Sequence, residues 1–259
     1  MVDRYTSFVA LALDRPVADV GAVVAAAARG TVVDRHAPVG DAQEAQEVYW
    51  GGRMQKAIVR RVESEHARPM LRVETYIGGE GPRQGLRRQA QLVAALADVV
   101  TESIEDVLDL SAAATRDLAW LGRVAGGDVA LDDVISAHAE GDVKRWVHTH
   151  GAARLDVPDL ELYGVPATKV GGAADALQHV HAQLLSGGLK AALSLQQGTA
   201  VHLVPVLEAW QTLPLDWPGI ARAGENRPGH GGPRATLSVL HKRRFGRYRR
   251  DYEGVLDRL

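Results

Sequence analysis

Paired glycines divide this chain into short segments, and that division limits what it can fold into more than any other feature. The pairs that separate predicted elements include Gly51-Gly52, Gly78-Gly79, Gly126-Gly127 and Gly187-Gly188. Glycine interrupts both helices and strands because it lacks the side chain that restricts the backbone. We therefore expect many short elements instead of a bundle of long helices.

The spacing of apolar residues assigns an element to each segment. After Pro82, the residues Leu86, Ala90 and Val93 recur at the interval of one helix face. Other segments are short, rich in β-branched residues and bounded by glycine, which is typical of strands. We expect strands at residues 4–13, 47–50, 55–62, 69–77, 107–110, 144–149, 159–163, 199–204 and 235–240, and helices at 16–30, 82–100, 115–124, 131–138, 173–185 and 248–256.

The order of these elements predicts the fold class. The first part reads strand, helix, strands, helix, strand, which is the order of a ferredoxin-like (split βαβ) domain. We predict an α+β fold of mainly antiparallel sheets flanked by helices. Residues 1–111 are expected to form the ferredoxin-like subdomain. Residues 112–259 are expected to form a second α+β subdomain that carries the sequences His-Thr-His-Gly and Pro-Asp-Leu-Glu-Leu.

Composition excludes several classes of protein. The chain has no cysteine, which rules out disulfides, thiol catalysis and cysteine-bound metals. Its formal net charge is -2, so no overall field attracts nucleic acid or an anionic membrane. The longest apolar run, residues 20–28, is far shorter than the roughly 20 residues that cross a bilayer. The charged N-terminus also lacks the apolar core of a signal peptide, so we expect a cytoplasmic protein without a membrane partner.

Two histidines give the chain a candidate metal site. His148 and His150 are two residues apart in a predicted strand, so both side chains point to the same face. Asp159 and Glu161 share a face of the next predicted strand in the same way. If these strands pair, two imidazoles and one carboxylate can bind a divalent metal ion. The alternative is structural: the histidines end a strand and hydrogen-bond to the backbone.

The same stretch carries a resemblance to a known group of sequences. Thr149-His150-Gly151 is followed by Pro158-Asp159-Leu160-Glu161-Leu162. This resembles the pattern Thr-His-Gly…Leu-Pro-Glu-Leu-Glu in uncharacterised bacterial proteins classed as domains of unknown function. Here an aspartate, Asp159, stands where those families have glutamate. The resemblance implies a mixed fold of helices and strands, and it implies no activity.

A basic segment near the C-terminus is a second candidate site. It combines cations with an aromatic side chain, as surfaces that contact phosphates and stack on bases do. The candidate residues are Lys242, Arg243, Arg244, Arg247, Tyr248 and Arg250. The alternative is an ordinary solvated face, because Glu253 and Asp257 follow and the whole chain is mildly acidic.

No recognised catalytic motif accompanies these features. The sequences Gly-x-Ser-x-Gly, His-Glu-x-x-His and the phosphate-binding P-loop are all missing. We therefore predict a non-catalytic bacterial protein without a cofactor that binds another protein through a sheet face or a strand edge. A role in bacterial stress or inter-bacterial conflict is a further hypothesis. The alternatives are a metal-dependent enzyme and a nucleic-acid-binding protein.

Overall fold

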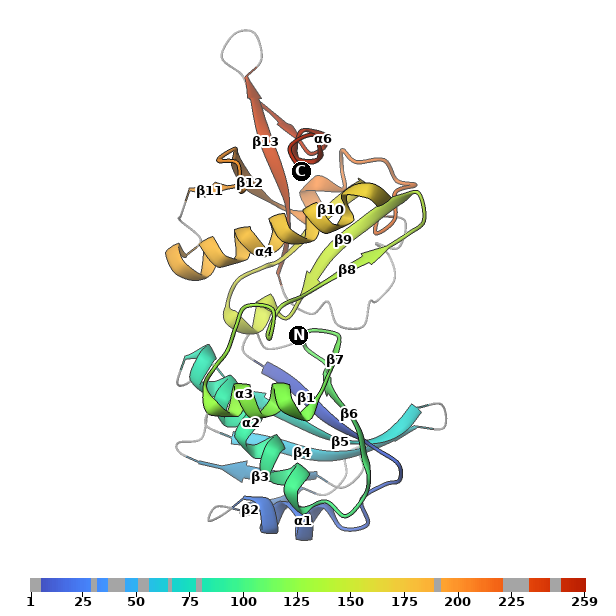
Figure 1. Ribbon diagram of the computed structural model, residues 1–259, viewed down its shortest axis with the longest axis vertical. Coiled ribbons are helices and arrows are strands. Elements are labelled where there is room, and N and C mark those ends of the chain that lie inside the picture. Colours follow the sequence, from blue (N-terminus) through green and yellow to red (C-terminus); the bar gives the residue numbers. More distant parts are fainter. Residues whose placement is uncertain are drawn as a thin grey trace. The chain divides into compact units, whose positions relative to one another are not determined.

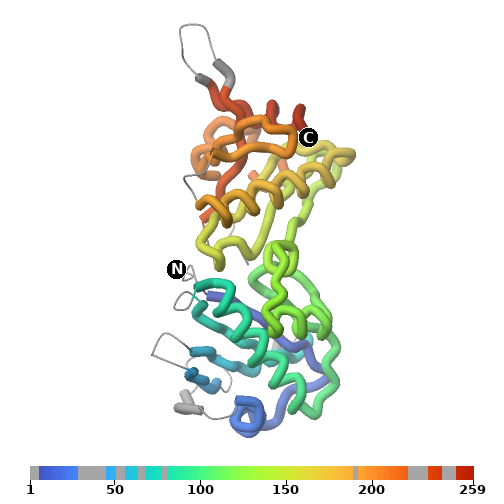
Figure 2. The backbone as a smooth tube through the Cα atoms, turned by 60° about the vertical axis from the view of Figure 1, so that its left-hand side comes forward, coloured from blue at the N-terminus to red at the C-terminus, as the bar shows by residue number. Residues whose placement is uncertain are grey.

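The chain forms two compact units in a computed structural model. The structure describes residues 6–28, 32–36, 45–50, 56–64, 67–77, 81–188, 192–220, 233–242 and 248–259. The N-terminal unit is Val2–Asp133 and the C-terminal unit is Val134–Leu259. In Figure 2 the N-terminal unit is coloured blue to green and the C-terminal unit green to red.

The N-terminal unit is an antiparallel sheet with helices packed on it. Its strands are β1 (Thr6–Leu13), β2 (Val32–His36), β3 (Ala45–Tyr49), β4 (Lys56–Ser64), β5 (Ala67–Tyr76), β6 (Ile104–Asp109) and β7 (Ala114–Arg116). Its helices are α1 (Val20–Ala27), α2 (Pro82–Val99) and α3 (Leu118–Gly126). The strands lie in the order β2-β3-β4-β5-β1-β6-β7. Within it, β6-β1-β5-β4 has the strand order of the predicted ferredoxin-like arrangement.

One apolar layer joins the three helices to this sheet. Alternate strand residues such as Val9, Leu11 and Val73 pack with Val93 and Leu96 of α2. All five are at most 3% exposed. The alternation of the strand residues and the helical spacing in α2 place apolar side chains toward the same layer, which explains why these segments fold together.

The C-terminal unit is a second, mainly antiparallel sheet. Its strands are β8 (Ser136–Glu140), β9 (Lys144–His150), β10 (Asp159–Pro166), β11 (Leu193–Ser194), β12 (Ala200–Pro205), β13 (Arg234–Lys242) and β14 (Tyr248–Asp251). Its helical elements are η2 (Ala152–Leu155), η3 (Ala167–Lys169), α4 (Val170–Gly187), α5 (Val206–Ala209) and α6 (Glu253–Leu256). The strands follow the order β11-β12-β13-β10-β9-β8, and β14 pairs with β13.

The two faces of this second sheet have different neighbours. Helix α4 lies across one face, over β8, β9 and β10 (Figure 1). On the other face, α5 and the chain after it pack against Trp146 and Tyr163. Gly219 in that chain has a φ of +91°, and a Cβ built there would lie 2.6 Å from Cγ of Trp146. Only glycine fits such a close approach at a positive φ.

The structure confirms the predicted α+β class with mainly antiparallel sheets. The strands predicted at 144–149 and 159–163 are β9 and the first part of β10. The helix predicted at 131–138 is wrong, because residues 136–140 form strand β8 and pair with β9. The unit boundary falls after α3, at Asp133 and Val134. Among the described residues, no helix has the length and apolar character needed to cross a membrane.

Candidate functional site

Three histidines from two neighbouring strands lie together on the sheet face opposite α4. In the register of β8 and β9, His138 faces His148 and Ser136 faces His150. The ring centres are 5.8 Å apart for His138 and His148, 5.0 Å for His138 and His150, and 4.9 Å for His148 and His150. We call these three residues the histidine cluster.

The cluster is held in place from one side and reaches solvent on the other. The indole of Trp146 stacks on the ring of His148 with their centres 3.6 Å apart. His148 is 1% exposed and His150 6%. On the edge strand β8, His138 and Glu140 are only half-buried. Oε1 of Glu140 lies 3.8 Å from Nε2 of His148, so a carboxylate stands beside the cluster.

A buried carboxylate network adjoins Trp146. Glu161, which faces His148 across β9 and β10, is fully buried. Its carboxylate accepts hydrogen bonds from the indole N–H of Trp146 at 3.0 Å and from the hydroxyl of Tyr163. It also pairs with Nη1 of Arg234 at 2.9 Å. Both carboxylate oxygens of Glu161 therefore already have partners within the protein.

Asp159 is the second buried carboxyl on this face. Its Oδ1 accepts the backbone N–H of Ala152 at 2.9 Å. Burial raises the pKa of Asp159 to about 7, because the ionised carboxylate loses solvation. The bond from Ala152 opposes that shift and the nearby charge of Glu161 adds to it. Asp159 thus carries its proton through the mildly acidic range.

A further buried histidine, His181, lies on α4, where it packs against the other face of the sheet. Nε2 of His181 lies 3.0 Å from Oγ1 of Thr149, which also accepts the backbone N–H of Leu160 at 2.8 Å. Burial lowers the pKa of His181 to about 3, so this imidazole stays neutral at physiological pH. The contact fixes α4 to β9 and β10.

The structure shows where the four predicted metal ligands lie. The prediction that His148 and His150 share a strand face is confirmed, and β9 does pair with β10. However, Glu161 is bound to Arg234, Trp146 and Tyr163, and Asp159 to Ala152. Across the described parts of the chain, no group of three or more histidine, aspartate or glutamate side chains is arranged to hold a metal ion. His138 was not predicted as a site residue, because residues 131–138 were expected to form a helix.

An apolar hollow of about 560 Å³ opens at one end of the same sheet. The end of β12 and the start of β13 lie side by side here, because the two strands run antiparallel. The hollow is lined by Pro158, Leu203, Pro205, Val206, Leu207, Pro233, Arg234 and Ala235. We call it the β12 hollow. Leu207, on its rim in the short helix α5, is 71% exposed.

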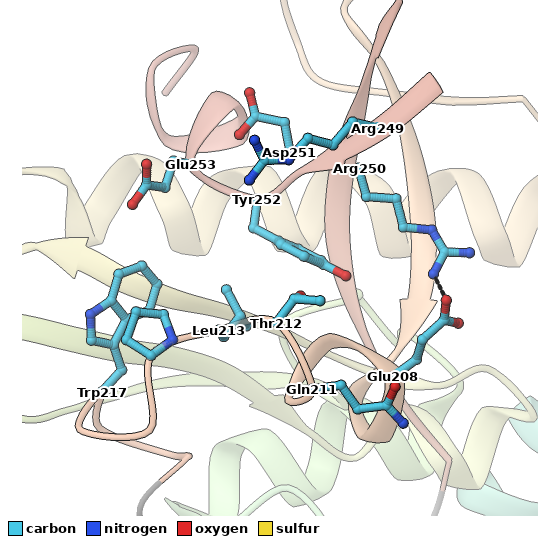
Figure 3. Close-up of a pocket in the computed structure, with 11 residues that line it drawn as sticks. Glu208, Gln211, Thr212, Leu213, Trp217, Arg249, Arg250, Asp251, Tyr252 and Glu253 are labelled. Atoms are coloured by element: carbon cyan, nitrogen blue, oxygen red, sulfur yellow. Dashed lines mark hydrogen bonds and ion pairs between the residues drawn. The ribbon is translucent and has the colours of Figure 1, made fainter. Parts of the chain in front are cut away.

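A second hollow, of about 550 Å³, lies on the other side of α5. Figure 3 shows the ring of Tyr252 lying in it, with Trp217 at one end and the ion pair of Glu208 and Arg250 at the other. Its lining mixes both signs of charge with aromatic side chains. Leu215, in the turn beside it, is 76% exposed.

The predicted basic segment is described only in part. Arg243, Arg244 and Arg247 lie outside the described residues. The backbones of Lys242 and Tyr248 belong to β13 and β14. Of the candidates, Arg250 has a described side chain, and its guanidinium pairs with Glu208. Nucleic-acid binding through this segment stays a prediction.

Comparison with known proteins adds no relative. No protein-family model, no curated protein and no solved structure matches this chain. The resemblance to uncharacterised bacterial families therefore stays a prediction based on the quoted residues.

Proposed function

We propose that this chain is a protein-binding module of the cytoplasm that holds an extended segment of its partner at the edge of β12. The observation that carries this proposal is the β12 hollow, an apolar cavity with the exposed Leu207 on its rim. A partner that covers Leu207 and fills the hollow would remove apolar surface from water, which favours association.

The edge of β12 supplies the backbone part of the site. Its neighbour β11 is two residues long and pairs with Ala200 and Val201 only. Among the described strands, none pairs with the outer side of residues 202–205. An unpaired edge of this kind accepts an added strand, whose main chain forms the hydrogen bonds.

The β12 hollow supplies the side-chain part of the site. It begins where the edge of β12 ends, and Leu203 and Pro205 of that strand line it. A bound strand directs alternate side chains to the same face, so one of them would enter the hollow. Its aliphatic and proline lining selects an apolar side chain. Arg234 is already paired with Glu161, so we expect no strong preference for an acidic residue.

Peptide selection tests this proposal directly. A random peptide library displayed on phage is selected on the full chain, and the affinity of the selected peptides is measured by fluorescence anisotropy. We expect peptides with apolar residues at alternate positions. Leu207→Asp should weaken their binding by about tenfold or more, equivalent to about 1.4 kcal/mol.

A matched variant provides the control. Val143 is 84% exposed and lies between β8 and β9, away from the lining of the β12 hollow. Val143→Asp adds the same charge and should leave peptide affinity within twofold. The proposal is wrong if no peptide is selected, or if Leu207→Asp and Val143→Asp bind the selected peptides equally well.

A further inference from the structure

We propose that one face of the N-terminal sheet binds single-stranded nucleic acid through Phe8, Arg60 and Arg72. The proposal does not rest on peptide binding at β12, because it concerns the other unit and another class of partner. Helices α1, α2 and α3 all pack on the face that carries Val9 and Leu11. Side chains alternate along a strand, so Phe8, Arg60 and Arg72 belong to the opposite face. We call this opposite side of the sheet the arginine face.

Two arginines lie directly opposite each other at the centre of the arginine face. Arg60 of β4 faces Arg72 of β5, and both strands have neighbours on either side. Like charges in this arrangement destabilise a sheet. Within the described part of the chain, neither guanidinium forms an ion pair or a hydrogen bond, and Nε of each is buried without a partner. Buried donors need an acceptor, and a phosphate held between two guanidiniums supplies one while removing the repulsion.

Aromatic side chains lie beside these arginines. The guanidinium carbon of Arg72 is 5.7 Å from the ring centre of Phe8, which is half-buried. Tyr76 of β5 and Tyr49 of β3 belong to the same face by strand register. Aromatic rings on a sheet stack with unpaired bases, and neighbouring cations bind the phosphates. Bases inside a duplex are stacked on each other, so this arrangement favours a single strand.

The carboxylates of the arginine face do not cancel its charge. Glu47 pairs with Lys56 at 2.6 Å, and Asp106 pairs with Arg68 at 3.1 Å. Glu74 forms no ion pair with a described residue, and it opposes an anionic partner. Two unpaired arginines exceed this one carboxylate. The face therefore has a local positive charge, although the whole chain has a formal net charge of -2.

Fluorescence anisotropy of a short labelled oligonucleotide, titrated with the full chain, tests the proposal. We expect the single strand to bind more tightly than the duplex of the same sequence, with an affinity that falls as salt is added. Joint replacement by Arg60→Gln and Arg72→Gln should weaken binding by about tenfold or more and reduce its salt dependence. Phe8→Leu keeps an apolar side chain but removes the ring, and it should weaken binding at least about fivefold.

Two further variants make the test specific. Glu74→Gln should strengthen binding, because it removes the carboxylate that repels phosphate. Arg83 is exposed on α2, so Arg83→Gln removes a positive charge away from the arginine face and should leave affinity unchanged. Circular dichroism checks the fold of each variant. The proposal is overturned if the wild-type chain does not prefer the single strand, or if the double variant at Arg60 and Arg72 binds it as tightly as Arg83→Gln does.

Ultraviolet cross-linking locates the bound oligonucleotide without any variant. Mass spectrometry of the irradiated complex should find adducts in fragments from β1, β4 and β5. Adducts confined to residues 242–250 would place binding in the basic C-terminal segment and contradict the proposal. An acidic peptide of the same charge, which has no bases to stack, should bind more weakly than the oligonucleotide. Equal affinity for the two would also contradict it.

Discussion

The two units of this protein bury different kinds of side chain. In the N-terminal unit, buried polar groups mainly satisfy the backbone: the Gln89 amide donates to the carbonyl oxygens of Ser7 and Val73. In the C-terminal unit, the described buried groups include several that titrate or carry charge: His148, His150, Arg154, Asp159, Glu161 and His181. Burying such groups costs free energy unless they are well partnered. The N-terminal unit buries the carboxylates of Glu47, Asp109 and Asp133, whereas the described buried histidines and arginine all lie in the C-terminal unit.

The largest effect on stability is expected at Glu161. Glu161→Ala leaves Arg234, the indole N–H of Trp146 and the hydroxyl of Tyr163 without their acceptor. Breaking a buried ion pair from one side costs about 3–5 kcal/mol. Urea denaturation followed by circular dichroism measures this loss. A loss below about 1 kcal/mol would mean that the network is not essential to the unit.

The pH dependence of stability should reveal Asp159. The pKa of this carboxyl is raised from 3.8 to about 7 in the folded chain, so the unfolded chain ionises first as the pH rises. The free energy of unfolding contributed by Asp159 is therefore full below about pH 4, decreases between about pH 4 and 7, and is constant above that range. Three pKa units correspond to about 4 kcal/mol.

Asp159→Asn isolates this contribution. The asparagine oxygen still accepts the N–H of Ala152, but it does not titrate. His181, whose pKa is lowered to about 3, has the opposite effect, because stability falls as the pH drops below 6.5. The difference in unfolding free energy between wild type and Asp159→Asn cancels the contribution of His181. A difference that does not change between pH 4 and 7 would contradict the shifted pKa.

A core substitution in the N-terminal unit sharpens the comparison. Leu96 of α2 is fully buried against the sheet. Leu96→Ala should cost about 3 kcal/mol, since it removes apolar contacts and leaves a cavity. Affinity for the selected peptides, measured well below the unfolding transition, should not change. Loss of peptide binding by the folded variant would show that the N-terminal unit contributes to the proposed site.

The smallest effect is expected at an exposed ion pair. Glu208 and Arg250 pair at the rim of the second hollow, with side chains 50% and 41% exposed (Figure 3). Glu208→Ala should change the unfolding free energy by less than about 1 kcal/mol, because solvent screens such pairs. Urea denaturation measures the change in unfolding free energy for Glu208→Ala and for Glu161→Ala. The difference between the two changes shows how much more a buried carboxylate contributes than an exposed one.

The sequence predicted the fold class and one part of the candidate site. Residues 144–150 were predictable as a strand, so the shared face of His148 and His150 followed from the two-residue period. His138 was not predictable in the same way. Its strand is short, reads Ser-Ala-His-Ala-Glu without a β-branched residue, and is defined by pairing with β9 more than by its own sequence. The β12 hollow was equally hidden, because it forms where distant segments end together.

Hydrogen exchange of the full chain with and without a peptide selected on it, followed by mass spectrometry of fragments, tests the proposed site most directly. A peptide strand added to β12 should slow exchange in residues 200–207. Fragments from β1 to β7 should exchange at the same rate in both samples. An unchanged rate in residues 200–207, or equal protection of both units, would contradict the account.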